Sequence, residues 1–178
     1  MAKFAFLGSS YIARFERFCN CDMKIPGMLP FFGVPGMRAD NVPYSKIREI
    51  KHFCPDVVCI LLGGNDISDK SSLCEIFRHI ANVVDEIKKV CDPKIYVCEL
   101  LPRGKFKFSK DLTYERYEAQ RKKINKKLRS LHHASVISLG KIKYPKDYIS
   151  DLVHLNESGQ KKLFIGIRTV ILSTQFLK

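Results

Sequence analysis

The sequence predicts a three-layer α/β/α fold built on a parallel sheet of about five strands. Short apolar runs alternate along the chain with longer segments whose apolar residues recur at helical spacing. Such alternation is typical of a parallel sheet with helices on both faces. The run Val57–Leu62 holds six apolar residues, the pattern of a strand buried on both faces. With 178 residues, 46% of them hydrophobic, we expect one domain over residues 1–178.

The individual elements follow from these patterns. Strands are expected at residues 3–7, 29–33, 57–62, 94–101 and 136–139, and helices at 11–18, 43–52, 71–90, 113–132 and after 156. Asn156 is a suitable N-cap for the last helix, and Asp66 for the helix that follows Gly63-Gly64-Asn65. Strict strand–helix alternation of this kind predicts a flavodoxin-like domain.

The composition indicates which partners and which cellular compartment to expect for the protein. The net charge is +13, which favours acidic partners such as nucleic acid or an anionic membrane. No apolar run is long enough to span a membrane, and residues 1–8 resemble a strand more than a signal peptide. The seven cysteines lack disulfide spacing, and Cys19-x-Cys21 has no second pair with which to bind zinc. We therefore expect an intracellular protein, cytoplasmic or nuclear, with free thiols and no bound metal.

Three polar clusters follow expected strands. Ser9-Ser10 follows the first, Asn65 the third, and Asp151-x-x-His154 the fifth. The carboxyl ends of parallel strands share one rim of a sheet, so these side chains should converge. A serine nucleophile needs a basic imidazole, the imidazole needs a carboxylate, and an oxyanion needs fixed N–H donors. Taken singly, each residue could equally be a helix cap, a turn residue or a structural histidine.

Together these motifs resemble the SGNH, or GDSL-type, hydrolases over nearly the whole chain. Gly8-Ser9-Ser10 matches the first block of that family, Gly63-Gly64-Asn65-Asp66 the third, and Asp151-x-x-His154 the last. The resemblance implies a triad of Ser10, His154 and Asp151, with an oxyanion hole formed by Ser10, Gly36 and Asn65. Gly33 is a competing candidate for the role of Gly36. Ser9 replaces the usual aspartate and Leu155 the common proline.

The activity implied by the resemblance is hydrolysis of carboxylic esters, including possible lipid esters, without metal or cofactor. We expect short to medium acyl chains to be preferred. Four apolar residues could line the acyl site or could instead form the second strand and core: Met28, Leu29, Phe31 and Phe32.

The basic residues concentrate in one part of the chain. Residues 103–148 hold 14 Lys or Arg and 4 Asp or Glu, hence +10 of the total charge. The stretch from Arg103 to Arg129 predicts either a solvated face or a surface that binds RNA or an anionic membrane. Small basic esterase domains of the SGNH type also occur in proteins of LINE-type retrotransposons, which this chain resembles. The alternative function is therefore a non-catalytic RNA- or membrane-binding module on the same fold.

Overall fold

The computed structural model describes residues 1–106 and 109–174, and it contains one sheet of five parallel strands. The strands lie in the order β2-β1-β3-β4-β5. Their bounds are β1 Phe4–Gly8, β2 Phe31–Gly33, β3 Val57–Leu61, β4 Lys94–Cys98 and β5 Ala134–Ile137. Every adjacent pair is parallel, so all five carboxyl ends lie along the same edge of the sheet. The predicted parallel sheet is confirmed.

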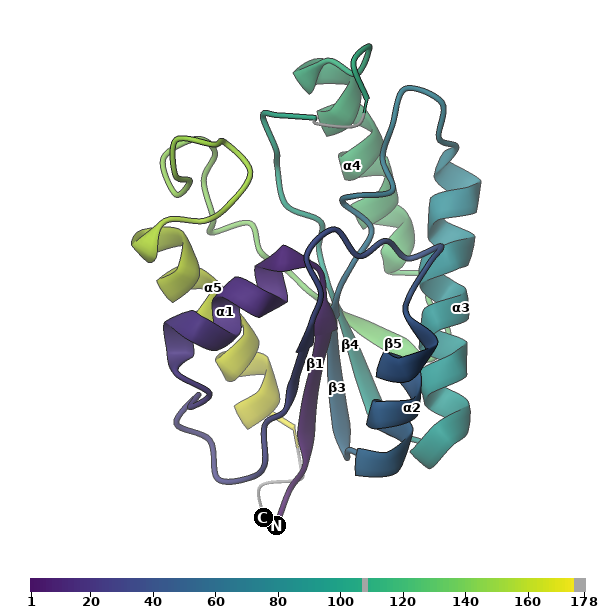
Figure 1. Cartoon of the computed structure of the whole chain (residues 1–178), viewed down its shortest axis with the longest axis vertical. Helices are drawn as coiled ribbons and strands as arrows, with labels where there is room; N and C mark the ends of the chain where they lie inside the picture. The colour runs from purple at the N-terminus through teal and green to yellow at the C-terminus, as the bar shows by residue number, and fades with distance from the viewer. Residues whose placement is uncertain (107–108, 175–178) are drawn as a thin grey trace.

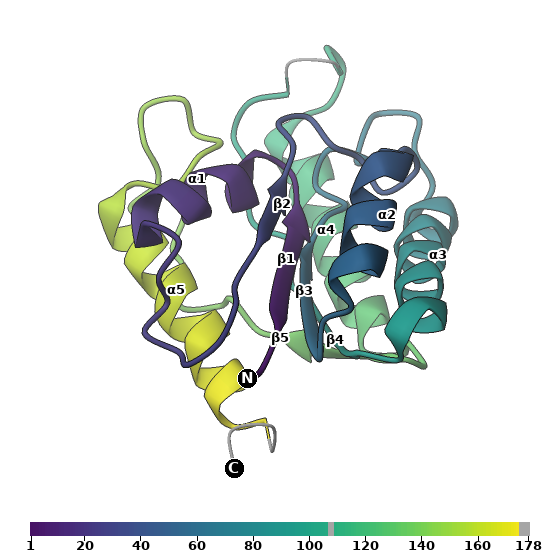
Figure 2. The same ribbon diagram turned by 60° about the horizontal axis from the view of Figure 1, so that its bottom comes forward.

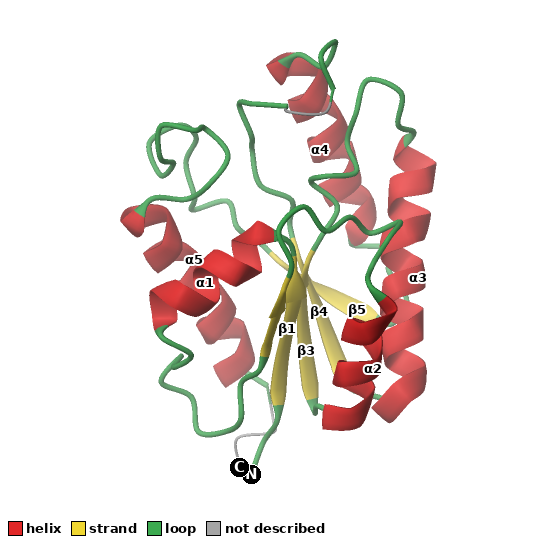
Figure 3. Ribbon diagram, viewed as in Figure 1, coloured by secondary structure: helices red, strands yellow, loops and turns green. Residues whose placement is uncertain are grey.

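Helices cover both faces of this sheet (Figures 1 and 2). Their bounds are α1 Ser10–Cys19, α2 Tyr44–Phe53, α3 Leu73–Cys91, α4 Tyr114–Leu128 and α5 Glu157–Leu172. Residues of α2, α3 and α4 enter one hydrophobic core, and residues of α1 and α5 enter the other. Figure 3 shows the resulting layers, with α1 and α5 on the opposite side of the strands from α2 and α3. The three-layer α/β/α prediction is confirmed.

The two cores follow from the period of two along each strand. In β1, Phe4 and Phe6 face the core with α1 and α5, whereas Ala5 and Leu7 face the other core. All five residues of β1 and of β3 are buried, because each strand has a helix layer on both faces. This is why their sequences are continuous apolar runs.

The strand order reverses direction next to β1. The chain passes from β1 outward to β2, then returns to the other side of β1 with β3, and continues through β4 to β5. Connections leave in opposite directions at that point, so a crevice opens beyond the carboxyl ends of β1 and β3. Ser10 lies two residues beyond the end of β1, and Asn65 lies four residues beyond the end of β3. The topology therefore brings two of the predicted site residues to the crevice.

Several predicted boundaries shift. The fourth strand ends at Cys98 rather than at residue 101, because the Leu100 N–H donates to the Asn125 side chain (2.7 Å) instead of to a neighbouring strand. The fifth strand begins two residues earlier than predicted, at Ala134. The basic helix ends at Leu128, although Leu131 beyond it remains buried. After the fourth strand and after the basic helix, buried loop residues extend the apolar pattern past the regular element.

The prediction that Asp66 caps a helix is wrong. The helix after β3 begins seven residues later, at Leu73, and the Ser72 side chain accepts the capping hydrogen bond from Glu75 N–H. Asp66 is buried and its carboxylate accepts from the backbone N–H groups of Ala39 and Asp40, at 3.0 and 3.2 Å. It therefore fastens the loop after β3 to the loop between β2 and α2. Asn156, by contrast, caps α5 as predicted.

The prediction that all cysteines are unpaired is also wrong. Cys54, which ends α2, and Cys91, the last residue of α3, form a disulfide with their Cα atoms 5.5 Å apart. The two residues are 37 positions apart in sequence and meet only because α2 and α3 pack side by side. Buried Cys59 and Cys98 are free thiols within the strands, as expected.

Within the part of the chain that the structure describes, none of the helices is both long and apolar enough to cross a lipid bilayer.

Candidate active site

Ser10 is the first residue of α1, and only Ser9 separates it from the end of β1 at Gly8. Ser9 occupies the N-cap position in extended conformation, and its carbonyl accepts from Ile12 and Ala13 N–H. Ser9 is buried, whereas Ser10 is half-buried and its Oγ lies 3.0 Å from His154 Nε2. The structure thus brings Ser10, and not Ser9, opposite the histidine, which is the register that the sequence predicts.

Asp151 and His154 share a tight turn before α5. One carboxylate oxygen of Asp151 accepts from the backbone N–H groups of Val153 and His154, at 2.9 and 2.8 Å. The other lies 2.6 Å from His154 Nδ1. Burial alone raises the pKa of Asp151, but the hydrogen bonds from His154 and Val153 outweigh it and lower that pKa to about 2. The carboxylate is therefore ionised and holds the proton of the imidazole on Nδ1, which leaves Nε2 free to accept from Ser10.

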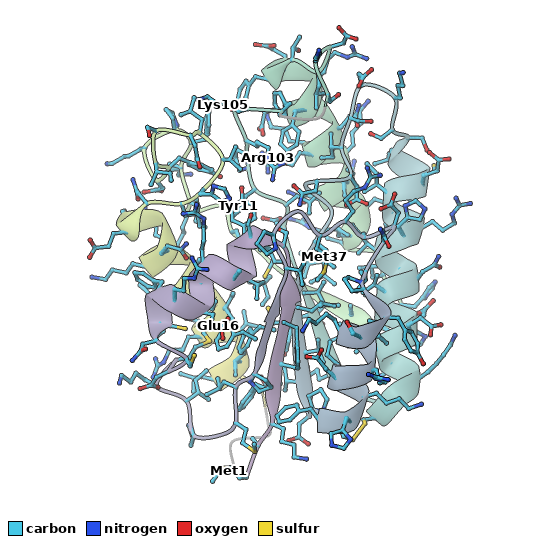
Figure 4. All side chains as sticks on the ribbon, viewed as in Figure 1. Met1, Tyr11, Glu16, Met37, Arg103 and Lys105 are labelled. Carbon is cyan, nitrogen blue, oxygen red and sulfur yellow. A yellow bond between two sulfur atoms is a disulfide. The ribbon has the colours of Figure 1, made fainter. Side chains whose placement is uncertain are left out.

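Two contacts that no sequence pattern indicated hold this turn in place. The buried Tyr11 hydroxyl donates to Val153 O at 2.6 Å, which joins α1 to the turn. Gly104 N–H, in the β4–α4 loop, donates to Leu152 O at 2.7 Å. Tyr11 directly follows Ser10, so one helix turn positions the serine and also holds the histidine segment. Figure 4 labels Tyr11 near the carboxyl ends of the strands.

Asn65 and Gly36 border the same space from the other side. The Asn65 side-chain amide donates one of its hydrogens to Met37 O at 2.9 Å. An amide nitrogen carries two hydrogens, so the second remains for another acceptor. Gly36 has φ of 78°, a conformation that favours glycine, and an added Cβ would meet no atom. Both residues line the pocket that contains Ser10 and His154.

Gly33, the competing candidate, has a different role. It is the last residue of β2, and a Cβ there would overlap the backbone of Ala13 in α1. Its lack of a side chain lets α1 pack directly against the edge strand. Gly36 is therefore the glycine that borders the pocket.

The pocket has a volume of about 920 Å³. Its apolar wall consists of Ala13, Pro35, Ile67, Phe106 and Val153. None of the four apolar residues proposed as walls lines it. Phe32 belongs to the core, Phe31 stacks on Phe6 at 4.6 Å between ring centroids, and Leu29 packs against the same core. The core interpretation therefore holds for Leu29, Phe31 and Phe32, of which the last two belong to β2. Met28 is 51% exposed and belongs neither to the core nor to the pocket wall.

Asp40, Asp66 and His79 place one potential metal-ligand atom each within 4.8 Å of one another. The Asp66 carboxylate is already engaged by backbone N–H groups, and Asp40 pairs with Arg38 at 2.6 Å. Two of these three side chains are therefore already engaged by other groups of the chain.

The profile of the GDSL-like Lipase/Acylhydrolase family matches residues 7–162, which include all five predicted site residues. The chain belongs to this family. A search of curated proteins found no significant match.

Several solved structures share the fold at low sequence identity. A GDSL-like lipase from Bacteroides thetaiotaomicron aligns with a TM-score of 0.74 and 15% identity over 95% of this chain and 87% of that one. A carbohydrate esterase family 3 protein from Talaromyces cellulolyticus aligns at 0.71 and 15%, covering 97% of both chains. An acetylxylan esterase from Geobacillus stearothermophilus aligns at 0.69 and 16%, covering 99% and 96%. At such identities the likeness shows the fold.

Proposed function

We propose that this member of the GDSL-like family is a serine esterase that hydrolyses carboxylic esters. The observation that carries the proposal is the continuous relay from Asp151 through His154 to Ser10, with contacts of 2.6 and 3.0 Å. These three residues line a pocket of about 920 Å³, a volume in the range of small-molecule binding sites.

The proposed mechanism uses only groups of this chain. His154 Nε2 takes the proton of Ser10 Oγ as that oxygen attacks the acyl carbon. The oxyanion that forms is held by the Ser10 backbone N–H, the Gly36 N–H and the unused hydrogen of the Asn65 amide. His154 then returns its proton to the leaving alcohol. Water, activated by the same imidazole, releases the acyl group from Ser10. Asp151 stabilises the imidazolium throughout.

Substrate size follows from the walls of the pocket. Five of the lining residues have apolar side chains, and most of the others are polar or charged. This favours short to medium acyl groups over long chains. Two structurally similar proteins are acetylxylan esterases, and a small acyl group here would agree with them, although the fold alone does not carry substrate identity.

Hydrolysis of p-nitrophenyl butyrate tests the proposal. Ser10→Ala should lower kcat by several orders of magnitude because it removes the nucleophile. Ser9→Ala is the matched control at the adjacent position, and it should retain a substantial part of the activity because the Ser9 side chain makes no capping hydrogen bond. An equal loss of activity in both variants, or a loss of activity only in Ser9→Ala, would contradict the assignment of Ser10 as the nucleophile.

A second candidate is binding of RNA or an anionic membrane by the basic region. Lys122, Lys123 and Lys126 are exposed along α4, which supports such a surface. Other cations of this helix are engaged: Arg121 pairs with Glu118 at 2.6 Å, and Lys127 lies over the Phe77 ring. Lys107 and Phe108 of the predicted basic loop lie outside the described residues. The resemblance to retrotransposon esterase domains stays a prediction.

A further inference from the structure

The pocket around Ser10 is strongly cationic. Five basic side chains line it, whereas Asp151 is its one acidic lining residue. Asp151 is committed to His154, and Arg38 is neutralised by Asp40 in a two-point contact of 2.9 and 2.6 Å. Four cations remain without such a partner in the described part of the chain: Arg14, Arg17, Arg103 and Lys105. A neutral ester has no need of four positive charges beside its reacting carbonyl.

Two of these cations are placed by α1. Arg14 and Arg17 follow Ser10 by four and seven residues, which puts all three on one face of the helix. At 1.5 Å per residue, the two arginines lie about 6 and 10 Å along the helix axis from Ser10. Ala13, on the same face, also lines the pocket and its small side chain leaves room beside them. The helix that begins at Ser10 therefore extends a row of guanidinium groups away from the reacting centre.

Arg103 provides the second, independent observation. It comes from the β4–α4 loop, is half-buried, and its Nε is buried without a hydrogen-bond partner. The Asp151 carboxylate, which lines the same pocket as Arg103, is engaged by His154. An incompletely paired charge in a partly buried position is unfavourable unless another group compensates it. Figure 4 shows Arg103 near Tyr11, with Lys105 further out on the same loop.

We infer that the ester hydrolysed at Ser10 carries an anionic group, a phosphate or a carboxylate, which Arg14, Arg17, Arg103 and Lys105 bind beside the scissile bond. This inference rests on the proposed esterase function and specifies its substrate class. Guanidinium groups bind the planar oxygen pairs of carboxylates and phosphates in two-point contacts. Binding of the anion also neutralises Arg103, which the protein alone leaves incompletely paired.

Two matched pairs of esters test the inference and locate the anion. Dibutyroylglycerol and dibutyroyl phosphatidate differ by a phosphate on the alcohol side. The p-nitrophenyl ester of butyrate and the mono-p-nitrophenyl ester of glutarate differ by a carboxylate on the acyl side. For at least one pair, kcat/KM should be about tenfold to a hundredfold higher for the anionic ester, the effect expected of charge-assisted hydrogen bonds. Ratios near one in both pairs would overturn the inference.

Substitutions then assign the preference to these residues. The double variant Arg14→Gln/Arg17→Gln and the single variant Arg103→Gln should each lower the anionic-to-neutral ratio of kcat/KM by about tenfold. Arg48→Gln is the control, because Arg48 is exposed on α2 and does not line the pocket. It removes the same charge and should leave the ratio unchanged. An equal fall in the control would show only a general effect of net charge and would contradict a specific site.

A binding measurement separates failure of this inference from failure of the proposed esterase function. Calorimetry on Ser10→Ala should show tighter binding of dibutyroyl phosphatidate than of dibutyroylglycerol, and Arg103→Gln added to Ser10→Ala should remove the difference. This result would support the anion site even if the wild-type protein hydrolysed neither ester. Hydrolysis of both esters at equal rates with equal binding would leave the esterase function standing and reject the anion site.

Discussion

Replacing Asp151 by asparagine should abolish most of the activity while it preserves the turn. The Asp151 oxygen that accepts from Val153 and His154 N–H has a counterpart in the asparagine carbonyl. The other oxygen, 2.6 Å from His154 Nδ1, becomes an NH₂ group, which can only donate. His154 Nδ1 must then accept, so the imidazole proton moves to Nε2 and faces Ser10. A base that already carries its proton cannot take another from the serine.

The expected loss is about 10⁴-fold in kcat, the cost of the wrong imidazole tautomer in a triad of this geometry. Turnover of p-nitrophenyl butyrate measures it, and thermal unfolding reports on the fold. Asp151→Ala is the comparison variant, since it also removes the acceptor for two backbone N–H groups and should be less stable than Asp151→Asn. Activity of Asp151→Asn within tenfold of wild type would refute the argument that this carboxylate sets the tautomer.

Wild type and Asp151→Asn should also differ in how their stability depends on pH in the acid range. The pKa of Asp151 is lowered from 3.8 to about 2, so the folded state binds this proton less tightly than the unfolded state does. The resulting stabilisation is complete above pH 4 and is lost as the pH falls toward about 2. A shift of this size corresponds to about 2.4 kcal/mol for a fully buried group. The carboxylate is 38% exposed, so screening reduces the expectation to about 1 kcal/mol. The stability difference between wild type and Asp151→Asn should shrink over that range.

Three further changes probe the surroundings of the triad. Asn65→Ala should lower kcat by about a hundredfold to a thousandfold with a smaller effect on KM, because an oxyanion donor acts mainly in the transition state; an unchanged kcat would leave Asn65 a purely structural role. Asp66→Ala should lower the free energy of unfolding by about 2 to 4 kcal/mol in urea denaturation, since one buried and one partly buried N–H group lose their acceptor; a loss below 1 kcal/mol would refute this. Replacing Lys122, Lys123 and Lys126 together by glutamate should weaken salt-dependent binding of RNA and anionic vesicles in filter and sedimentation assays, whereas unchanged binding would mean that α4 is a solvated face.

Local sequence patterns were sufficient to predict those parts of the fold that depend on the residues of a single element. The apolar run Val57–Leu62 predicted a doubly buried strand because its neighbours on both faces are helices, whatever their identity. The ends of parallel strands lie on one edge, so the order of motifs alone predicted that Ser10, Asn65 and His154 would converge. The register between Ser9 and Ser10 was predicted from the family resemblance, and the structure brings Ser10 next to His154.

Contacts between segments that are distant in the sequence could not be predicted from it. Cys54 and Cys91 meet through the packing of two helix ends, and nothing in their spacing indicates it. Asp66 has the sequence context of a helix cap, yet its partners lie 26 and 27 residues earlier in another loop. Helical spacing predicts that Arg14 and Arg17 lie on the same face of the helix as Ser10. This prediction requires that the helix begin at Ser10, which the structure shows. The position of Arg103 depends on a long loop with no regular pattern.

Covalent labelling with a fluorophosphonate probe tests the central claim most directly, because such probes react with a serine only when a neighbouring base activates it. Digestion and mass spectrometry of the labelled protein should locate the phosphonate on Ser10. His154→Ala should abolish the labelling, and Ser9→Ala should leave it in place. Absence of an adduct in the wild-type protein, or an adduct on any residue other than Ser10, would contradict the account.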